Sequence, residues 1–489
     1  MDANVGVGHQ AVPAAPATQR LRSNVLSLWP VVAMGLAYMS LAPVIYFNAG
    51  FMESEAGGPA MPLAFILVTF AILPTGISFA IMNNRRPSAG SAFRWLWESV
   101  APPVGLWTGW LLTAVYVLAA AIYPAYMLVF FNPFLAYFGI PYSFWTGVPA
   151  ALGLVAVGTY MVKHDIRLST KTIAVFMTIE AGFLLLLSLY IIVKQGAAGH
   201  LTLKPFTPSA ATSFDGFLLA LVFGFLSIAG VDSAAPVAEE AKTPRSLIPL
   251  ATILITLGAG AFYTFCSYAV AVSVPPKTVI AYVNAGLFTP LYPIAGSYVD
   301  GLKILVPLTA WSASLASYGA SIVCASRLLY AMARQGYAPA TFARLDPKKQ
   351  IPWNASIPAL AFSAVVPILL GIWLGENGSN AAGWVGGVFV FCVLIAYSLV
   401  NLANLVYHQR FARDQFNWLT TALVPVLGIA INLYILYKGF FQAYLSAGFQ
   451  MGISIVLVAV AWAVVGIFWA AWQWRRRRAV VEAELPSYV

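Results

Sequence analysis

The feature that most constrains this chain is the alternation of long apolar windows with short polar joints. A helix that crosses a bilayer needs about 20 mostly apolar residues, and about twelve windows reach that length. A soluble globule is excluded, because 61% of the residues are hydrophobic and only 9% are charged, too few to build a charged surface. The expected spans are 26–50, 61–84, 104–131, 144–162, 170–193, 213–236, 247–273, 297–334, 356–374, 383–407, 418–438 and 449–474.

The distribution of lysine and arginine predicts how the spans are oriented. An even number of spans places both termini on one side, and cytoplasmic joints are enriched in basic residues. All but five of the 26 basic residues fall in the tails, in the even-numbered joints or at the span ends beside them. We therefore expect both tails, residues 1–24 and 475–489, in the cytoplasm of a cell whose plasma (bacterial inner) membrane holds the chain. The net charge of +10 reflects this topology, and it predicts no nucleic-acid partner.

Patterns that would support catalysis, metal binding or ATP hydrolysis are lacking. The four histidines are far apart, and the three cysteines lie inside apolar spans without pairing or metal spacing. No G-x-x-x-x-G-K-[ST] phosphate loop occurs. The sequence predicts a protein that is not an enzyme and uses no metal or cofactor, so transport would run on an ion gradient or on exchange.

Two spans carry Gly, Ser or Pro inside their apolar windows. The first span contains Ser40-Leu41-Ala42-Pro43, and the sixth contains Ser227-Ile228-Ala229-Gly230. A proline inside a helix removes a backbone hydrogen bond, and helices broken at corresponding places mark the substrate site of transporters built from inverted repeats. The alternative is that small residues only let the helices approach closely. With broken helices, free N–H groups in the first span would face a carboxylate, and carbonyls in the sixth would face an ammonium group.

Three motifs resemble those of the amino acid–polyamine–organocation permeases. They are residues 230–249, which read GVDSAAPVAEEAKTPRSLIP, residues 87–93, which read PSAGSAF, and residues 326–336, which read SRLLYAMARQG. The resemblance implies an all-α membrane protein with the leucine-transporter-like fold. Two inverted repeats of five helices, about 25–193 and 213–407, would form a core of residues 25–407, with helices 1 and 6 broken. Two additional helices would occupy residues 408–474.

The resemblance also implies the function, a secondary-active amino acid permease that works by alternating access, with proton symport or exchange. Its substrate would bind between the two breaks, and Tyr116 and Tyr123 are further candidates for the pocket wall. One departure is that the first break lacks the glycines usual in the family. The candidate substrate-binding residues are Ser40, Leu41, Ala42, Pro43, Phe223, Phe225, Leu226, Ser227, Ile228 and Gly230.

Two acidic residues are candidates for coupling transport to protons. Glu180 lies about ten residues into the fifth span, near the middle of the bilayer, where a charge costs ~2.5–3.5 kcal/mol on insertion scales. Asp232 follows the sixth-span break, at the acidic position of the family motif. The alternatives are that Glu180 only holds spans together by hydrogen bonds and that Asp232 caps a half-helix.

Ser314 and Ser317 form a candidate sodium site, together with Ser312 and Ser321 of the same span. Serines at this density also allow helices to pack closely, which is the plain alternative. Sodium therefore stands beside the proton as a candidate coupling ion.

A charged cluster follows the sixth span and faces basic residues elsewhere in the cytoplasmic joints. It is a candidate inner gate that exchanges ion pairs, and the plain alternative is a solvated loop whose pairs contribute ~0–1 kcal/mol. The candidate gate residues are Glu239, Glu240, Lys242, Arg245 and Arg327, with Arg334 nearby.

Two other functions remain open. A polyamine or organic-cation carrier would use Asp232 or Glu180 as the countercharge, and a nutrient sensor would bind the same ligand without moving it. The expected partners are a small-molecule substrate, the coupling ion and membrane lipids.

Overall fold

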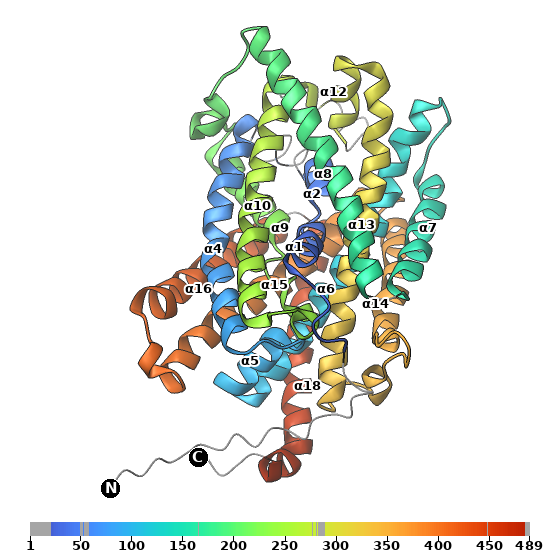
Figure 1. The fold of residues 1–489 in the computed structure, drawn as a ribbon. Coiled ribbons are helices and arrows are strands. Elements are labelled where there is room, and N and C mark those ends of the chain that lie inside the picture. Colours follow the sequence, from blue (N-terminus) through green and yellow to red (C-terminus); the bar gives the residue numbers. More distant parts are fainter. Residues whose placement is uncertain are drawn as a thin grey trace.

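The computed structural model describes residues 21–48, 52, 58–164, 166–275, 277–279, 281, 289–446 and 448–484. These residues form a bundle of long helices (Figure 1). Eleven of the described helices are long and apolar enough to cross a membrane, so the chain is a multi-pass membrane protein. The predicted all-α class is confirmed. Residues 1–20 of the first predicted tail and 485–489 of the second lie outside the described residues, whereas 475–484 continue the last helix.

The principal helices follow the predicted spans closely. Between them lie the short helices α5 (Ser91–Ser99), α12 (Leu291–Tyr298) and α17 (Ala443–Ser446). The spanning elements are α1 (Leu28–Tyr38), α4 (Met61–Arg85), α6 (Pro102–Tyr137), α7 (Phe144–Val162), α8 (Ile166–Ala197), α9 (Phe214–Ile228), α10 (Pro244–Ser273), α13 (Leu305–Arg334), α14 (Trp353–Trp373), α15 (Gly378–Arg410), α16 (Val424–Ile435) and α18 (Ser454–Glu484).

The first span is broken where the sequence places Ser40 before Pro43. Helix α1 ends at Tyr38, and the chain resumes as α2 (Leu41–Pro43), which continues into a π-helical turn at η2 (Val44–Asn48). Between them Ser40 adopts a left-handed backbone conformation with φ 60° and ψ 56°, which is uncommon for a residue other than glycine. The break is therefore real, and a serine rather than a glycine forms it.

The sixth span is broken too, which explains why only eleven full-length spans are found among the described residues. Helix α9 stops at Ile228 after 15 residues, and Gly230 follows with φ 147°, a region that favours glycine. The chain then passes through turns into the 3-10 segment η7 (Ala235–Glu240) instead of a second α-helical half.

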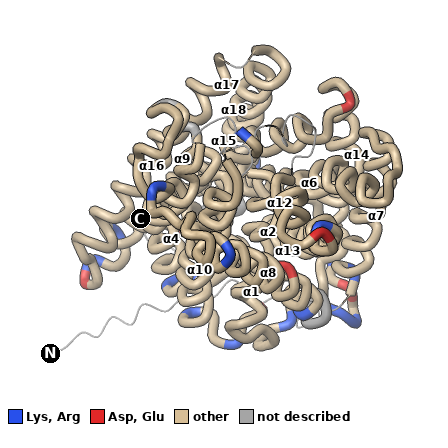
Figure 2. The backbone as a smooth tube through the Cα atoms, turned by 90° about the horizontal axis from the view of Figure 1, so that it is seen from above, with Lys and Arg blue, Asp and Glu red and all other residues tan. Residues whose placement is uncertain are grey.

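The broken segments lie inside the bundle and the last helices lie outside it. Helix α1 packs against α8, α10 and α13, while α4 packs against α10 and α6 packs against α13 and α15. The pair α4 and α10 approach so closely that a Cβ atom on Gly260 would collide with the side chain of Thr69. Helix α16 lies on the side of the bundle opposite α7 and α14 (Figures 1 and 2), and charged residues are sparse along the tube (Figure 2). Helix α18 packs against α6 and α15.

Candidate substrate and coupling site

Tyrosine hydroxyls accompany several of the backbone carbonyls that the two breaks expose. The hydroxyl of Tyr263, on α10, donates to the carbonyl oxygen of Met39 at 2.5 Å and lies 3.2 Å from that of Ser227. It therefore bridges the free ends of α1 and α9. Tyr123, on α6, donates to the carbonyl oxygen of Tyr38 at 3.2 Å and also hydrogen-bonds the Ser40 hydroxyl. Buried carbonyls without partners are costly, so these tyrosines stabilise the broken conformation.

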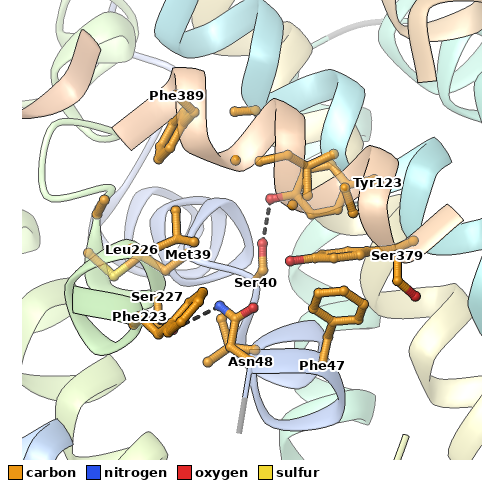
Figure 3. A pocket seen from close by; sticks show the side chains of 18 of the residues that line it. Met39, Ser40, Phe47, Asn48, Tyr123, Phe223, Leu226, Ser227, Ser379 and Phe389 are labelled. Carbon is orange, nitrogen blue, oxygen red and sulfur yellow. Dashed lines mark hydrogen bonds between the residues drawn. The ribbon is translucent and has the colours of Figure 1, made fainter. Parts of the chain in front are cut away.

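A cavity of about 180 Å³ lies beside both breaks. Its walls come from α1, η2, α6, α9, the start of α15 and the C-terminal helices, and among the described residues that line it none carries a charge. Figure 3 shows how Phe47, Phe223 and Phe389 surround it, with the Ser40 hydroxyl pointing to Tyr123. The cavity is therefore a mostly apolar, aromatic chamber with a few hydroxyl and amide groups.

The cavity separates the candidate binding residues into two groups. Ser40, Phe223, Leu226 and Ser227 line it, and so does Tyr123. The remaining candidates lie outside its lining, because their side chains are buried in the packing around the breaks or, for glycine, absent; they are Leu41, Ala42, Pro43, Phe225, Ile228 and Gly230.

One hydrogen bond joins the two broken spans across the cavity. The side-chain amide of Asn48, at the end of η2, donates to the hydroxyl of Ser227 at 2.9 Å (Figure 3). The Ser227 hydroxyl in turn donates to the carbonyl oxygen of Phe223 at 2.8 Å. This link fixes the second half of the first span against the last turn of α9.

Asp232 is buried and accepts hydrogen bonds from two tyrosines of other helices. Tyr116, on α6, donates to one carboxyl oxygen at 2.6 Å, and Tyr397, on α15, donates to the other at 2.5 Å. The Tyr397 hydroxyl also accepts the backbone N–H of Gly230 at 2.9 Å. Tyr397 therefore connects the carboxylate directly to the backbone of the sixth-span break. Among the described residues, the side chain of Asp232 bonds to these tyrosines rather than to the amides of a half-helix.

Glu180, in contrast, has no hydrogen-bond partner among the described residues. Both carboxyl oxygens are buried without a donor, and the residue is 0% exposed on α8. An ionised carboxylate without donors inside a membrane protein costs several kcal/mol. Glu180 therefore differs from Asp232 in having no donor among the described residues that would stabilise a negative charge.

The serines of α13 are buried, but most of their hydroxyls bond to their own helix. Ser314 donates to the carbonyl oxygen of Ala310 at 2.7 Å, and Ser321 donates to that of Ser317 at 2.9 Å. Among the α13 serines, Ser317 is the one whose hydroxyl has no hydrogen-bond partner in the described part of the chain. Within that part, no group of three or more His, Cys, Asp or Glu residues could hold a metal ion.

Two ion pairs close the end of the bundle that carries η7. Arg327 meets Glu240 at 3.1 and 3.3 Å, and both side chains are almost completely buried. Arg334 meets Glu239 at 2.8 and 3.1 Å. Lys242 and Arg245 are exposed, and among the described residues neither belongs to a salt bridge. Three of the five candidate gate residues, Glu239, Glu240 and Arg327, thus meet in ion pairs.

Several residues that complete the site were not predicted from the sequence. Tyr397, Tyr263, Asn48 and Phe389 lie on spans whose sequence carries no break or motif at those positions. An aromatic residue in a membrane helix is usually packing or an interfacial anchor. Only contact with a partner distant in sequence identifies them.

Comparison with known proteins shows the family and the fold. The family model described as amino acid permease matches residues 32–483. The low-affinity putrescine importer PlaP of Escherichia coli (strain K12) is 25% identical, over 93% of this chain and 95% of its own. The cationic amino acid transporter 3, mitochondrial, of Arabidopsis thaliana is 26% identical, over 77% of this chain and 62% of its own.

A more distant relative and a solved structure agree with this assignment. The methylthioribose transporter of Bacillus subtilis (strain 168) is 22% identical, over 87% of this chain and 90% of its own. A crystal structure of the Eremococcus coleocola manganese transporter, 11% identical, superposes with a TM-score of 0.57 over 92% of this chain and 97% of that one. It shows the shared leucine-transporter-like fold, which confirms the predicted architecture. With a family model matched over nearly its whole length, the chain belongs to the amino acid permease family.

Proposed function

We propose that the chain is a secondary-active permease for uncharged amino acids, rather than an enzyme or a sensor. The observation that carries the proposal is the cavity beside both breaks, which has apolar walls and no charged lining residue among those described. Such a chamber suits an amino acid, because its ammonium and carboxylate charges sum to zero and its side chain can pack against the aromatic walls. Alternating access within residues 25–407 would move it, with residues 408–474 outside the moving core.

The broken helices offer complementary groups for the two charges of an amino acid. The amides of Leu41 and Ala42 begin α2, and the first helical bond there runs from the N–H of Val44 to the carbonyl of Ser40, so both amides precede the bonded turn. Pro43 has no N–H and removes a third donor. The substrate carboxylate would face this pair, and its ammonium group would face the carbonyl end of α9.

A polyamine is less well matched to the cavity. Putrescine carries two positive charges, and burying them would call for carboxylates in the wall. Asp232 lies outside the lining and already accepts two tyrosine hydroxyls. We therefore propose that this chain carries a different substrate from the putrescine importer, although the two proteins share a family.

Glu180 is the proposed proton carrier. It is the one buried carboxyl in the described spans without a partner, and without a donor to stabilise its charge the neutral form would be favoured. Glu180 would release its proton only in a conformation in which water reaches the carboxyl group. A proton symporter needs a carrier whose proton release depends on conformation in this way. Three of the serines on α13 bond to their own helix, so we expect transport independent of sodium.

Asp232 would link protonation to the conformation of the sixth-span break. Its partner Tyr397 donates to the carboxylate and accepts from Gly230, so a change in the carboxylate would alter the bond to the break. The end of the bundle with the ion pairs Glu240–Arg327 and Glu239–Arg334 is the proposed cytoplasmic side, closed in this conformation. The proposed location is the bacterial inner membrane, with both termini cytoplasmic.

The test is uptake into liposomes that contain the purified full-length protein. We expect accumulation of leucine or phenylalanine driven by an inward proton gradient, with little competition from putrescine or arginine and no need for sodium. The Glu180→Gln variant should still exchange substrate but should lose dependence on external pH. A matched control is Glu376→Gln, because Glu376 lies in the joint between α14 and α15. Strong competition by putrescine, or unchanged pH dependence in Glu180→Gln, would contradict the proposal.

A further inference from the structure

A second, larger groove lies on the outside of the bundle, between the segment that leads into α1 and the first half of α8. Its volume is about 460 Å³, equivalent to about fifteen water molecules at ~30 Å³ each. One wall is formed by residues 25–30 and the other by residues 170–179. The groove is separate from the substrate cavity, with which it shares no lining residue.

The groove opens toward the membrane. Trp29, Val175 and Ile179 line it and are 62%, 49% and 54% exposed, respectively. On a helix that crosses a bilayer, exposed apolar side chains of this kind contact lipid. Any molecule that fills the groove must therefore have a chain as apolar as lipid tails.

One end of the groove is basic. Lys171 lines it and is exposed, and no salt bridge to it is found among the described residues. Ile179 lies eight residues further along α8, about 12 Å at 1.5 Å per residue. Lys171 is near the start of the span and Ile179 is next to the buried Glu180, so the groove runs from a membrane surface toward the middle of the bilayer.

We propose that this groove binds one anionic phospholipid, with its phosphate at Lys171 and an acyl chain between Leu26, Trp29 and Ile179. The groove has a cationic end and apolar walls, and an anionic phospholipid has an anionic headgroup and apolar acyl chains. On the orientation proposed above, the groove belongs to the cytoplasmic leaflet, where anionic lipids attract basic residues. The lipid site itself does not depend on what the protein transports.

The lipid would brace the closed end of the bundle. The backbone amides of Val25 and Leu26 both donate to the carbonyl of Glu240, at 2.9 and 3.0 Å, and Lys242 donates back to Leu26 at 2.9 Å. The side chain of Glu240 holds the buried ion pair with Arg327. A lipid that contacts both residues 25–29 and α8 would therefore hold residues 25–29 against the bundle. Because these residues bond to Glu240, this would stabilise the ion pair of Glu240 with Arg327.

The test is native mass spectrometry of the full-length protein titrated with phosphatidylglycerol or with phosphatidylcholine that has the same acyl chains. We expect the wild type to retain one phosphatidylglycerol in preference to phosphatidylcholine. Lys171→Gln should weaken phosphatidylglycerol binding about five-fold, the contribution of one basic residue at a membrane surface. Ala174→Phe, which fills the groove, should weaken both lipids.

Two controls keep the outcome clear. Lys348→Gln removes an exposed lysine from the joint before α14, outside the groove, and should bind phosphatidylglycerol as the wild type does. Thermal unfolding of each variant reports whether it is folded. Equal binding of the two lipids by the wild type, or the same loss in Lys171→Gln and Lys348→Gln, would overturn the proposal. Because neither measurement involves transport, its failure would leave the proposed function intact.

Discussion

Two buried carboxyl groups in the same bundle differ in the hydrogen-bond donors around them. Asp232 accepts hydrogen bonds from Tyr116 and Tyr397, which come from two different helices. Glu180 is equally buried and has no donor among the described residues. Two hydroxyl donors stabilise a negative charge on Asp232 without water, whereas Glu180 has no such donor among the described residues. The difference teaches that burial alone does not set a role, because the donors around a carboxyl decide which charge state the fold supports.

The largest effect should come from removing the carboxylate that the tyrosines surround. Asp232→Leu leaves two buried hydroxyls without an acceptor, at ~1–3 kcal/mol each, so we expect stability to fall by about 2–6 kcal/mol. Thermal unfolding of the purified protein in detergent measures the loss. Asp232→Asn keeps an acceptor and should lose less. If Asp232→Leu melts with the wild type, the tyrosine cage contributes nothing to stability.

Tyr397→Phe should have the next largest effect. It removes a hydrogen bond to a charged group, worth ~1.5–3 kcal/mol, and the partner of the Gly230 amide, worth ~0.5–1.5 kcal/mol. Tyr116→Phe is the matched comparison, because among the described residues the Tyr116 hydroxyl bonds to Asp232 and not to the backbone of the break. We expect Tyr397→Phe to melt below Tyr116→Phe and to lower the uptake rate further. Equal losses in the two variants would show that the bond to the break is unimportant.

The effect of Glu180 should have the opposite sign. Glu180→Met replaces an unpartnered carboxyl with an apolar chain of similar length, which should raise stability by about 1–3 kcal/mol while abolishing proton-driven uptake. The same thermal assay, with liposome uptake beside it, separates the two consequences. A fall in stability comparable to that of Asp232→Leu would mean that Glu180 has a bound ion or water as its partner.

The smallest effect concerns another unpartnered group, the Ser317 hydroxyl on α13. Ser317→Ala removes a buried hydroxyl without a partner, and Ser314→Ala removes one that bonds to its own helix. Both should change stability by less than about 1 kcal/mol, with Ser317→Ala the more stable of the two. Uptake measured in sodium and in potassium should be equal for both variants. Loss of sodium-dependent uptake in Ser317→Ala would restore the sodium site as the coupling element.

Most of the fold was predictable because it follows from local properties of the chain. Apolar windows locate the spans, since the membrane demands about 20 apolar residues for each. Pro43 and Gly230 locate the two breaks, since both act on their own backbone. Glu239 and Glu240 in one motif and Arg327 in another pointed to a charged cluster, and these three residues do take part in ion pairs. The sixth span was predicted as one window, and its second half proved to be a 3-10 segment.

The partners inside the site were not predictable in this way. Tyr397 and Asp232 are 165 residues apart, and Tyr263 and Met39 are 224 apart. Nothing near Tyr397 or Tyr263 in sequence distinguishes them from the other tyrosines of the spans. The side chains of Leu41, Ala42 and Phe225 were candidates because they sit at the breaks, but a break orients backbone groups and leaves the side chains to the packing around it.

By itself, the sequence determined that this chain spans the membrane, where two spans break and which acids lie in apolar surroundings, because each of these depends on residues adjacent in the chain. Only the tertiary structure decided which acid accepts hydrogen bonds and which side chains line the cavity. It also decided which tyrosine bridges the two breaks. The physical reason is that a hydrogen bond acts over about 3 Å. Helices distant in sequence must therefore be packed together before the partner of any buried group is defined.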